Sequence, residues 1–300
     1  MIGFNALGYL GRLGNQMFQF AALKGIARNR GFNYCIPPSD SYTEDANVEQ
    51  YDAQVASGKA MHQLFLPFKL TNTSDLNCQY LDPKRPTAPE AGFTFDENMF
   101  NRVPDMVNIQ GFFQSWKYFK NIEDEIRGDF EFKDFVQDPC KEMMSGFDTP
   151  PISLHIRRKD YVTNPNHTAL GIEYYEKALK EFGEDETVLV FSDDPEWCSE
   201  QDFFSDDRFL VNTDVPRYDH LCLEGDGTQK HSCVPYTDLC LMSLCNGAIL
   251  SSSTLGWWGA WLQKGRTNPV VVPEHWYGPT LEEVNDCRDL YPEEWTVIPN

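Results

Sequence analysis

Short apolar runs alternate with amphipathic segments throughout the second half of the chain. Turn-forming or polar residues bound each run, which is typical of buried strands. The segments between the runs carry apolar side chains at helical spacing, as in Tyr175, Leu179 and Phe182. Strands that alternate with helices favour a parallel sheet. The pattern predicts strands at residues 152–156, 188–191, 209–211, 248–250 and 270–272, and helices at 172–182, 236–245 and 257–262.

The N-terminal residues predict a strand, a glycine-spaced turn and a helix. Residues 2–7 are suited to the strand and residues 8–14 to the turn. Asn15 is a suitable N-cap for a helix that ends at Gly31. This order of elements opens a Rossmann-like unit. The next clear elements are a strand at 107–113 and a helix at 116–126.

The middle of the chain is less regular. Residues 37–105 are rich in proline and polar residues, so we expect short helices and long loops there. Asp138-Pro139 and the prolines at 150 and 151 frame a polar linker. We therefore expect an α/β protein with two domains, at residues 1–148 and 149–300.

The net charge disfavours two classes of partner. The formal charge is −21, which argues against binding to nucleic acid or to an anionic membrane surface. No stretch approaches the roughly 20 apolar residues of a membrane-spanning helix, and no signal peptide is visible. We expect a cytoplasmic protein whose 9 cysteines are reduced. The alternative is a disulfide within residues 222–245.

Two adjacent arginines follow the first predicted strand of the second half. Arg157 and Arg158 lie at the carboxyl end of that strand. In open α/β sheets, ligands bind at the carboxyl ends of the strands. A guanidinium offers a planar fork of donors that suits phosphate oxygens, so a nucleotide-sugar diphosphate is the first ligand to consider. The alternative is that the two arginines form ion pairs with acidic neighbours and that Asp160 orients them. His155 is either a catalytic residue or a buried core histidine whose ring nitrogens are hydrogen-bonded.

Three further polar segments lie at predicted junctions between strand and helix. Arg12, Asn15 and Gln16 surround a helix N-terminus, which favours an anion or a sugar but is also compatible with a plain tight turn. Asp193-Asp194 suits a ribose or base contact, or else an N-cap beside a solvated acid. Ser252, Ser253 and Thr254 offer hydroxyls and free amides to a phosphate, although the tryptophans after them suit a core helix.

These segments together resemble the α-1,2-fucosyltransferases, glycosyltransferase family 11, and more distantly the protein O-fucosyltransferases and α-1,6-fucosyltransferases. Any one match is modest, but five in the family's order are specific. Residues 37–105 and 218–235 match nothing in that pattern. The matching motifs are Gly11–Ala21, Gly111–Phe119, His155–Tyr161, Phe191–Trp197 and Asp238–Trp261.

The resemblance implies a GT-B fold, in which two Rossmann-like domains face a cleft. GDP-fucose would lie mainly on the C-terminal domain, with the acceptor on the N-terminal side and without a metal or other cofactor. Arg158 would bind the diphosphate, with Arg157 beside it. His155 and Asp238 would contact the guanine. Asn15 would lie near the fucose. Ser253 and Thr254 would contact the diphosphate. Leu255-Gly256 departs from the family, which more often has an aromatic residue and a serine.

The implied reaction inverts a β-linked fucose to an α product in one displacement. The acceptor implied by the family is a galactose-ended oligosaccharide. The candidates for the base that accepts the proton of the acceptor hydroxyl are Asp160 and an acid within residues 37–105. Inversion requires this base to lie opposite the leaving group, and the sequence does not show which candidate does. The alternatives are a fucosyltransferase of another linkage, a transferase of another GDP-sugar, and a non-catalytic glycan- or nucleotide-binding protein. A phosphotransferase is disfavoured, because the chain has no phosphate-binding loop ending in Gly-Lys-Ser/Thr.

Overall fold

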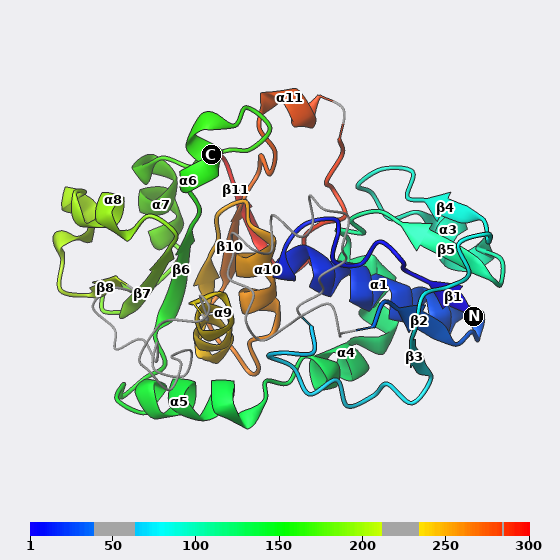
Figure 1. The fold of residues 1–300 in the computed structure, drawn as a ribbon. Coiled ribbons are helices and arrows are strands. Elements are labelled where there is room, and N and C mark those ends of the chain that lie inside the picture. Colours follow the sequence, from blue (N-terminus) through cyan, green and yellow to red (C-terminus); the bar gives the residue numbers. More distant parts are fainter. Residues whose placement is uncertain (39–63, 212–233, 284) are drawn as a thin grey trace, which may run out of the picture. The chain divides into compact units, whose positions relative to one another are not determined.

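The computed structural model describes residues 1–38, 64–211, 234–283 and 285–300. These residues form two compact units (Figure 1). The N-terminal unit holds the described residues of 1–133 together with 286–292, and the C-terminal unit holds the others from 134 onwards. The further expectation, that residues 1–148 are the acceptor side and 149–300 the donor side, stays a prediction.

The C-terminal unit is built on a six-stranded sheet in the order β11-β10-β9-β6-β7-β8. Every neighbouring pair in it is parallel. The expected strands are all present, and a sixth at the C-terminus lies at one edge. The strands are β6 (Ile152–Ile156), β7 (Val188–Ser192), β8 (Phe209–Val211), β9 (Ala248–Ile249), β10 (Val270–Pro273) and β11 (Thr296–Ile298).

Both faces of the central strand β6 are covered, because its side chains alternate between them. Ile152, Leu154 and Ile156 pack into one core with Tyr175 of α7. On the other face His155 contacts Gly256 of α10. The helices are α5 (Asp134–Met144), α6 (Lys159–Thr163), α7 (Ile172–Leu179), α8 (Pro195–Ser199), α9 (Val234–Leu244), α10 (Thr254–Trp261) and α11 (Pro279–Glu282), with a 3-10 turn η4 (Asp202–Ser205).

The N-terminal unit is built on a five-stranded parallel sheet in the order β3-β2-β1-β5-β4. Its strands are β1 (Ile2–Gly3), β2 (Tyr34–Ile36), β3 (Leu76–Cys78), β4 (Thr87–Pro89) and β5 (Val107–Gln110). Its helices are α1 (Leu13–Arg30), α3 (Glu97–Arg102) and α4 (Glu123–Asp129), with the 3-10 turns η2 (Trp116–Tyr118) and η3 (Lys120–Ile122).

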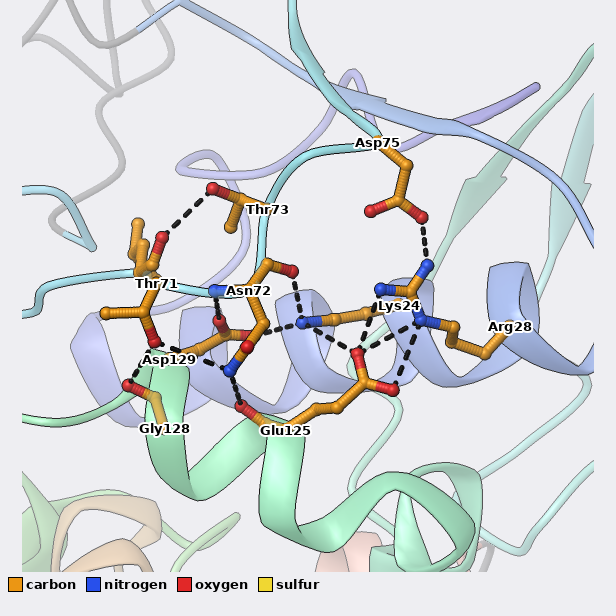
Figure 2. A network of polar contacts seen from close by, with 10 residues as sticks. Lys24, Arg28, Thr71, Asn72, Thr73, Asp75, Glu125, Gly128 and Asp129 are labelled. Atoms are coloured by element: carbon orange, nitrogen blue, oxygen red, sulfur yellow. Dashed lines mark hydrogen bonds and ion pairs between the residues drawn. The ribbon is translucent and has the colours of Figure 1, made fainter.

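A buried cation fixes α1 within the N-terminal unit (Figure 2). Lys24 and Asp129 are both fully buried and form an ion pair between α1 and α4. The Lys24 ammonium also donates to the Asn72 carbonyl oxygen at 2.7 Å, and Asp129 accepts from the Asn72 amide at 2.8 Å. One turn along α1, Arg28 pairs with Asp75 and with Glu125. The network therefore ties α1, α4 and residues 72–75 together.

Four sequence expectations differ from the structure. The expected strands at 2–7 and 107–113 are shorter, because β1 ends at Gly3 and β5 ends at Gln110. The expected helix at 116–126 is divided into η2, η3 and α4, because the backbone leaves helical geometry at Phe119 (φ −129°, ψ 5°) and again at Ile122. The expected polar linker contains α5, which tolerates Pro139 and buries Val136 and Cys140. In the region 37–105, α3 is one of the expected short helices, but β3 and β4 are strands where loops were expected. β3 and β4 are edge strands, and proline at a sheet edge loses no ladder bond.

No disulfide joins two cysteines of the described residues. Cys245 is among them, while Cys222 and Cys233 lie outside the described residues. Within the same residues, no helix has both the length and the apolar character that crossing a bilayer requires. The cytoplasmic location stays a prediction.

Candidate active site

The polar residues that follow β6, β7 and β9 meet at one edge of the C-terminal sheet. These three strands are parallel neighbours, so their carboxyl ends lie side by side. We call this group the arginine cluster. Its members are His155, Arg157, Arg158, Asp160, Asp193, Asp194, Trp197, Ser251, Ser252, Ser253 and Thr254.

Arg157 is held by two carboxylates. One terminal nitrogen lies 2.9 Å from the Asp193 Oδ2 atom as an ion pair without hydrogen-bond geometry, and another pairs with Asp160 one turn along α6. Its guanidinium also lies 5.2 Å from the ring centre of Tyr161. Asp160 therefore has the orienting role that the sequence allowed, and the charge of Arg157 is largely compensated.

Arg158 is held differently, on the face of an aromatic ring. Its guanidinium lies 3.7 Å from the ring centre of Trp197, and its Nε atom lies 3.4 Å from the Asp194 Oδ2 atom. Among the described residues, neither of its terminal nitrogens makes a hydrogen bond. A stacked guanidinium is fixed in direction while its outer donors stay available, which suits a phosphate ligand.

The two aspartates after β7 organise the loop. Asp193 accepts from the Arg158 backbone amide at 2.8 Å, which fixes the turn between β6 and α6. Asp194 caps α8, where it accepts from the Trp197 amide at 3.4 Å. It thereby places Trp197 beneath Arg158. In the described part of the chain, no group of three or more His, Cys, Asp or Glu side chains is arranged to hold a metal ion.

His155 is a buried neutral side chain at the end of β6. Its Nδ1 atom lies 2.7 Å from the Ser251 hydroxyl, and only 7% of its surface is exposed. Burial lowers the pKa of His155 to about 3, and the nearby charge of Arg157 acts in the same direction. The imidazole is therefore uncharged at neutral pH, so it can offer one donor or acceptor but no positive charge.

The N-terminus of α10 offers a second set of donors beside the arginines. Ser253 is its N-cap and makes no capping side-chain bond, which leaves first-turn amides without that partner. Ser252 is 2% exposed, and its buried hydroxyl has no hydrogen-bond partner in the described structure. A helix N-terminus with an unpartnered buried hydroxyl is suited to an anion. Asp238 lies half-buried on α9, which packs against α10.

A second polar cluster lies at the start of α1 in the N-terminal unit. Gly11 has φ +79°, and a Cβ there would lie 2.0 Å from the Asn15 Nδ2 atom, so only glycine fits. The Asn15 side chain accepts from the Gln114 amide at 2.8 Å, and Gln16 donates to the Gly11 carbonyl at 3.2 Å. The helix starts at Leu13 with the exposed Arg12 as N-cap, so Asn15 is not the cap that the sequence suggested.

Sequence reasoning missed three residues of these clusters. Trp197 was part of a motif, but nothing in the sequence showed that it lies under Arg158. Gln114 lay in the Gly111–Phe119 motif without an assigned role. Glu90 had no signal at all in its proline-rich segment, although both backbone amides of Phe112 and Phe113 donate to it at 2.9 Å. Its surroundings raise the pKa of Glu90 to about 7, mainly through burial.

Similarity to solved structures confirms the expected α/β fold with two Rossmann-like units. The chain superposes on the NodZ α-1,6-fucosyltransferase soaked with GDP-fucose with a TM-score of 0.51 and 13% identity, covering 87% of this chain and 91% of that one. At this identity the likeness shows the fold.

Sequence comparison identifies relatives across nearly the whole chain. An α-1,2-colitosyltransferase of Escherichia coli is 28% identical over 96% of both chains. The galactoside α-(1,2)-fucosyltransferase 1 of Rattus norvegicus is 24% identical over 86% of this chain and 63% of its own length. The family model described as glycosyl transferase family 11 matches residues 59–299. With both polar clusters at the carboxyl edges of parallel sheets and this match across most of its length, the chain belongs to glycosyl transferase family 11.

Proposed function

We propose that this glycosyltransferase moves L-fucose from GDP-fucose to a hydroxyl of an oligosaccharide, at O-2 of a galactose. Membership of the family supports glycosyl transfer. The rat relative, named as a galactoside α-(1,2)-fucosyltransferase, supports the sugar, the acceptor and the linkage. A structural neighbour whose crystals were soaked with GDP-fucose supports the donor.

The observation that carries the proposal is that Arg158 and the N-terminus of α10 follow two neighbouring strands and both offer donors. Arg158 presents terminal nitrogens that no described residue binds, and Ser252 presents an unpartnered buried hydroxyl. The two come from neighbouring strand ends, after β6 and β9. In our proposal the diphosphate lies between them and also contacts Ser253 and Thr254. His155 and Asp238 contact the guanine, and Asp193 and Asp194 hold the arginines.

Arg158 would act mainly in the transition state. As the bond to fucose breaks, negative charge grows on the leaving diphosphate, so a fixed donor stabilises the transition state more than the ground state. Arg157 already faces Asp193 and Asp160, so it contributes less. Asp160 pairs with Arg157 through Oδ1 only and is more than half exposed, so a base role for it would fall to Oδ2. We further propose that Arg12, Asn15 and Gln16 contact the fucose, as the family resemblance implies.

A second donor sugar is favoured by one specific relative. The α-1,2-colitosyltransferase is the more similar of the two named relatives, at 28% identity. Its name implies transfer of colitose through the same linkage. A donor other than GDP-fucose, bound through the same nucleotide and diphosphate contacts, is therefore the alternative function.

The direct test is transfer from GDP-fucose to a panel of galactosides, with the linkage of each product determined by NMR. We expect an α-1,2-linked fucose on galactose and the same rate in the presence of a chelator. GDP-colitose as the better donor would support the alternative. Products from neither donor, with the protein folded and binding GDP, would contradict catalysis and favour a nucleotide-binding protein.

We predict that Gly256→Ala weakens binding of GDP by about fivefold or more. A Cβ at residue 256 would lie 2.9 Å from the Cγ atom of His155, so the imidazole must move. Overpacking of this kind costs about 1–3 kcal/mol, and about 1.4 kcal/mol is tenfold in affinity. Calorimetric titration with GDP measures the effect. Gly259→Ala on the same helix is the control, because its Cβ would press on Met242 at 2.7 Å and not on His155. Equal GDP affinity in the two variants would contradict the role of His155.

A further inference from the structure

Glu90 lies at the carboxyl edge of the N-terminal sheet, directly after β4. Its backbone continues the pairing of β4 with β5, since the Glu90 amide donates to the Gln110 carbonyl oxygen at 2.8 Å. Its Oε2 atom accepts from the backbone amides of both Phe112 and Phe113, each at 2.9 Å. A Cβ on Gly111 would lie 2.5 Å from the Glu90 Cβ atom, so this glycine permits the close approach.

The turn that Glu90 holds is strained and carries a functional side chain. Phe113 has φ +53°, a left-handed conformation that costs free energy for any residue other than glycine. Two bonds to one carboxylate oxygen offset that cost. The next residue, Gln114, is 7% exposed and donates through its amide to the Asn15 Oδ1 atom at 2.8 Å. A continuous path of hydrogen bonds and backbone thus runs from Glu90 to Asn15.

We propose that Glu90 is a positioning residue for Asn15: it fixes the turn at residues 111–113 so that Gln114 holds the asparagine in the orientation that meets the donor sugar. The assignment rests on the proposed function for the role of Asn15. We assign Glu90 no direct contact with substrate, because its second oxygen, Oε1, is buried within the protein.

The charges around Glu90 define the conditions of the test. Among the described residues, the ionisable groups that interact with Glu90 are Asp96, the N-cap of α3, and the phenol of Tyr118. The Tyr118 phenol in turn interacts with Asp289, which pairs with Lys117. Since burial raises the pKa of Glu90 to about 7, the carboxylate is charged at pH 8. A glutamine would keep a carbonyl oxygen for the two amides, whereas a leucine would keep only the volume.

The first experiment compares Glu90→Gln, Glu90→Leu, Gln114→Ala and the double variant Glu90→Leu/Gln114→Ala in fucosyl transfer at pH 8. Because a displacement of about 1 Å can cost up to a hundredfold in rate, we expect Glu90→Leu to lose between about tenfold and a hundredfold in kcat/KM. We expect Glu90→Gln to stay within about threefold of the wild type. The double variant should be no worse than Gln114→Ala, since both changes act on one path.

Three outcomes would overturn the proposal. Loss in Glu90→Gln as severe as in Glu90→Leu would mean that the carboxylate acts as an acid or base. Wild-type activity in Glu90→Leu would mean that the turn needs no such support. Additive losses in the double variant would mean that Glu90 acts by another route than Gln114.

A second measurement does not depend on catalytic turnover, and it does not use the Glu90→Leu variant, which could fail to fold. The side-chain amide resonances of Gln114 and Asn15 should shift with pH in the wild-type protein, with a midpoint near pH 7, and stay constant in Glu90→Gln. Resonances that titrate identically in both proteins would contradict the coupling. A wild-type protein that transfers no fucose but shows the titration would count against the proposed function and not against the coupling.

Discussion

Replacement of Arg158 by lysine should lower kcat by about a hundredfold or more, the usual cost of losing one transition-state donor. Lysine keeps the charge but lacks the planar fork that lies 3.7 Å from the ring centre of Trp197. A flexible ammonium would not stay stacked, and its donors would no longer point where charge grows on the leaving diphosphate. Steady-state transfer from GDP-fucose, with kcat and KM measured separately, shows the effect.

Two other arginines provide controls for this result. Arg208→Lys changes an arginine that also lies over an aromatic ring, Phe209 at 5.0 Å, but at the start of β8 and away from the strand ends that form the site. It should keep the wild-type rate. Arg157→Lys should lose less than Arg158→Lys, because Asp160 and Asp193 already compensate Arg157. An Arg158→Lys protein that keeps most of its kcat would remove Arg158 from the proposed mechanism.

Replacement of Lys24 by methionine should lower the free energy of unfolding by about 3–5 kcal/mol, the typical cost of leaving a buried charge without its partner. Lys24 and Asp129 are both 0% exposed, so the carboxylate would be left without its cation in the interior (Figure 2). Burial already raises the pKa of Asp129 despite the ammonium beside it. Urea unfolding at neutral pH, followed by circular dichroism, measures the change.

The matched controls separate a buried ion pair from an exposed one. Lys69→Met breaks a pair with Glu131 at 3.0 Å in which the side chains are 32% and 44% exposed. It should cost no more than about 1 kcal/mol. The double variant Lys24→Met/Asp129→Leu should recover much of the lost stability, because no uncompensated charge remains. Equal destabilisation by Lys24→Met and Lys69→Met would contradict the account of the network.

Much of the C-terminal unit could be predicted from the sequence. Its central strands are fully buried, so they read as continuous apolar runs, and β6 was placed at Ile152–Ile156 without error. Because parallel strands present their carboxyl ends together, the ion pair of Arg157 with Asp193 fits the alternative of acidic partners that the sequence left open. The α/β class followed from the alternation of strands and helices, whereas the pair of Rossmann-like units was implied by the family resemblance.

Other features had no local signal. The strands β3 and β4 are short and partly exposed, so their side chains show no apolar run. Helix α5 was hidden by Pro139, whose usual effect is outweighed by the packing of Val136 and Cys140. The partner of Arg158 is Trp197 in α8, the helix after β7, and the partner of the Phe112 amide is Glu90, which follows β4. Only the fold brings such pairs together.

The most direct measurement of the central claim is a crystal structure of the protein with GDP. We predict that the diphosphate accepts hydrogen bonds from the terminal nitrogens of Arg158 and from the hydroxyl of Ser252 at the N-terminus of α10. A diphosphate bound away from both, with the Arg158 nitrogens turned to Asp194 and the Ser252 hydroxyl paired within the protein, would contradict it.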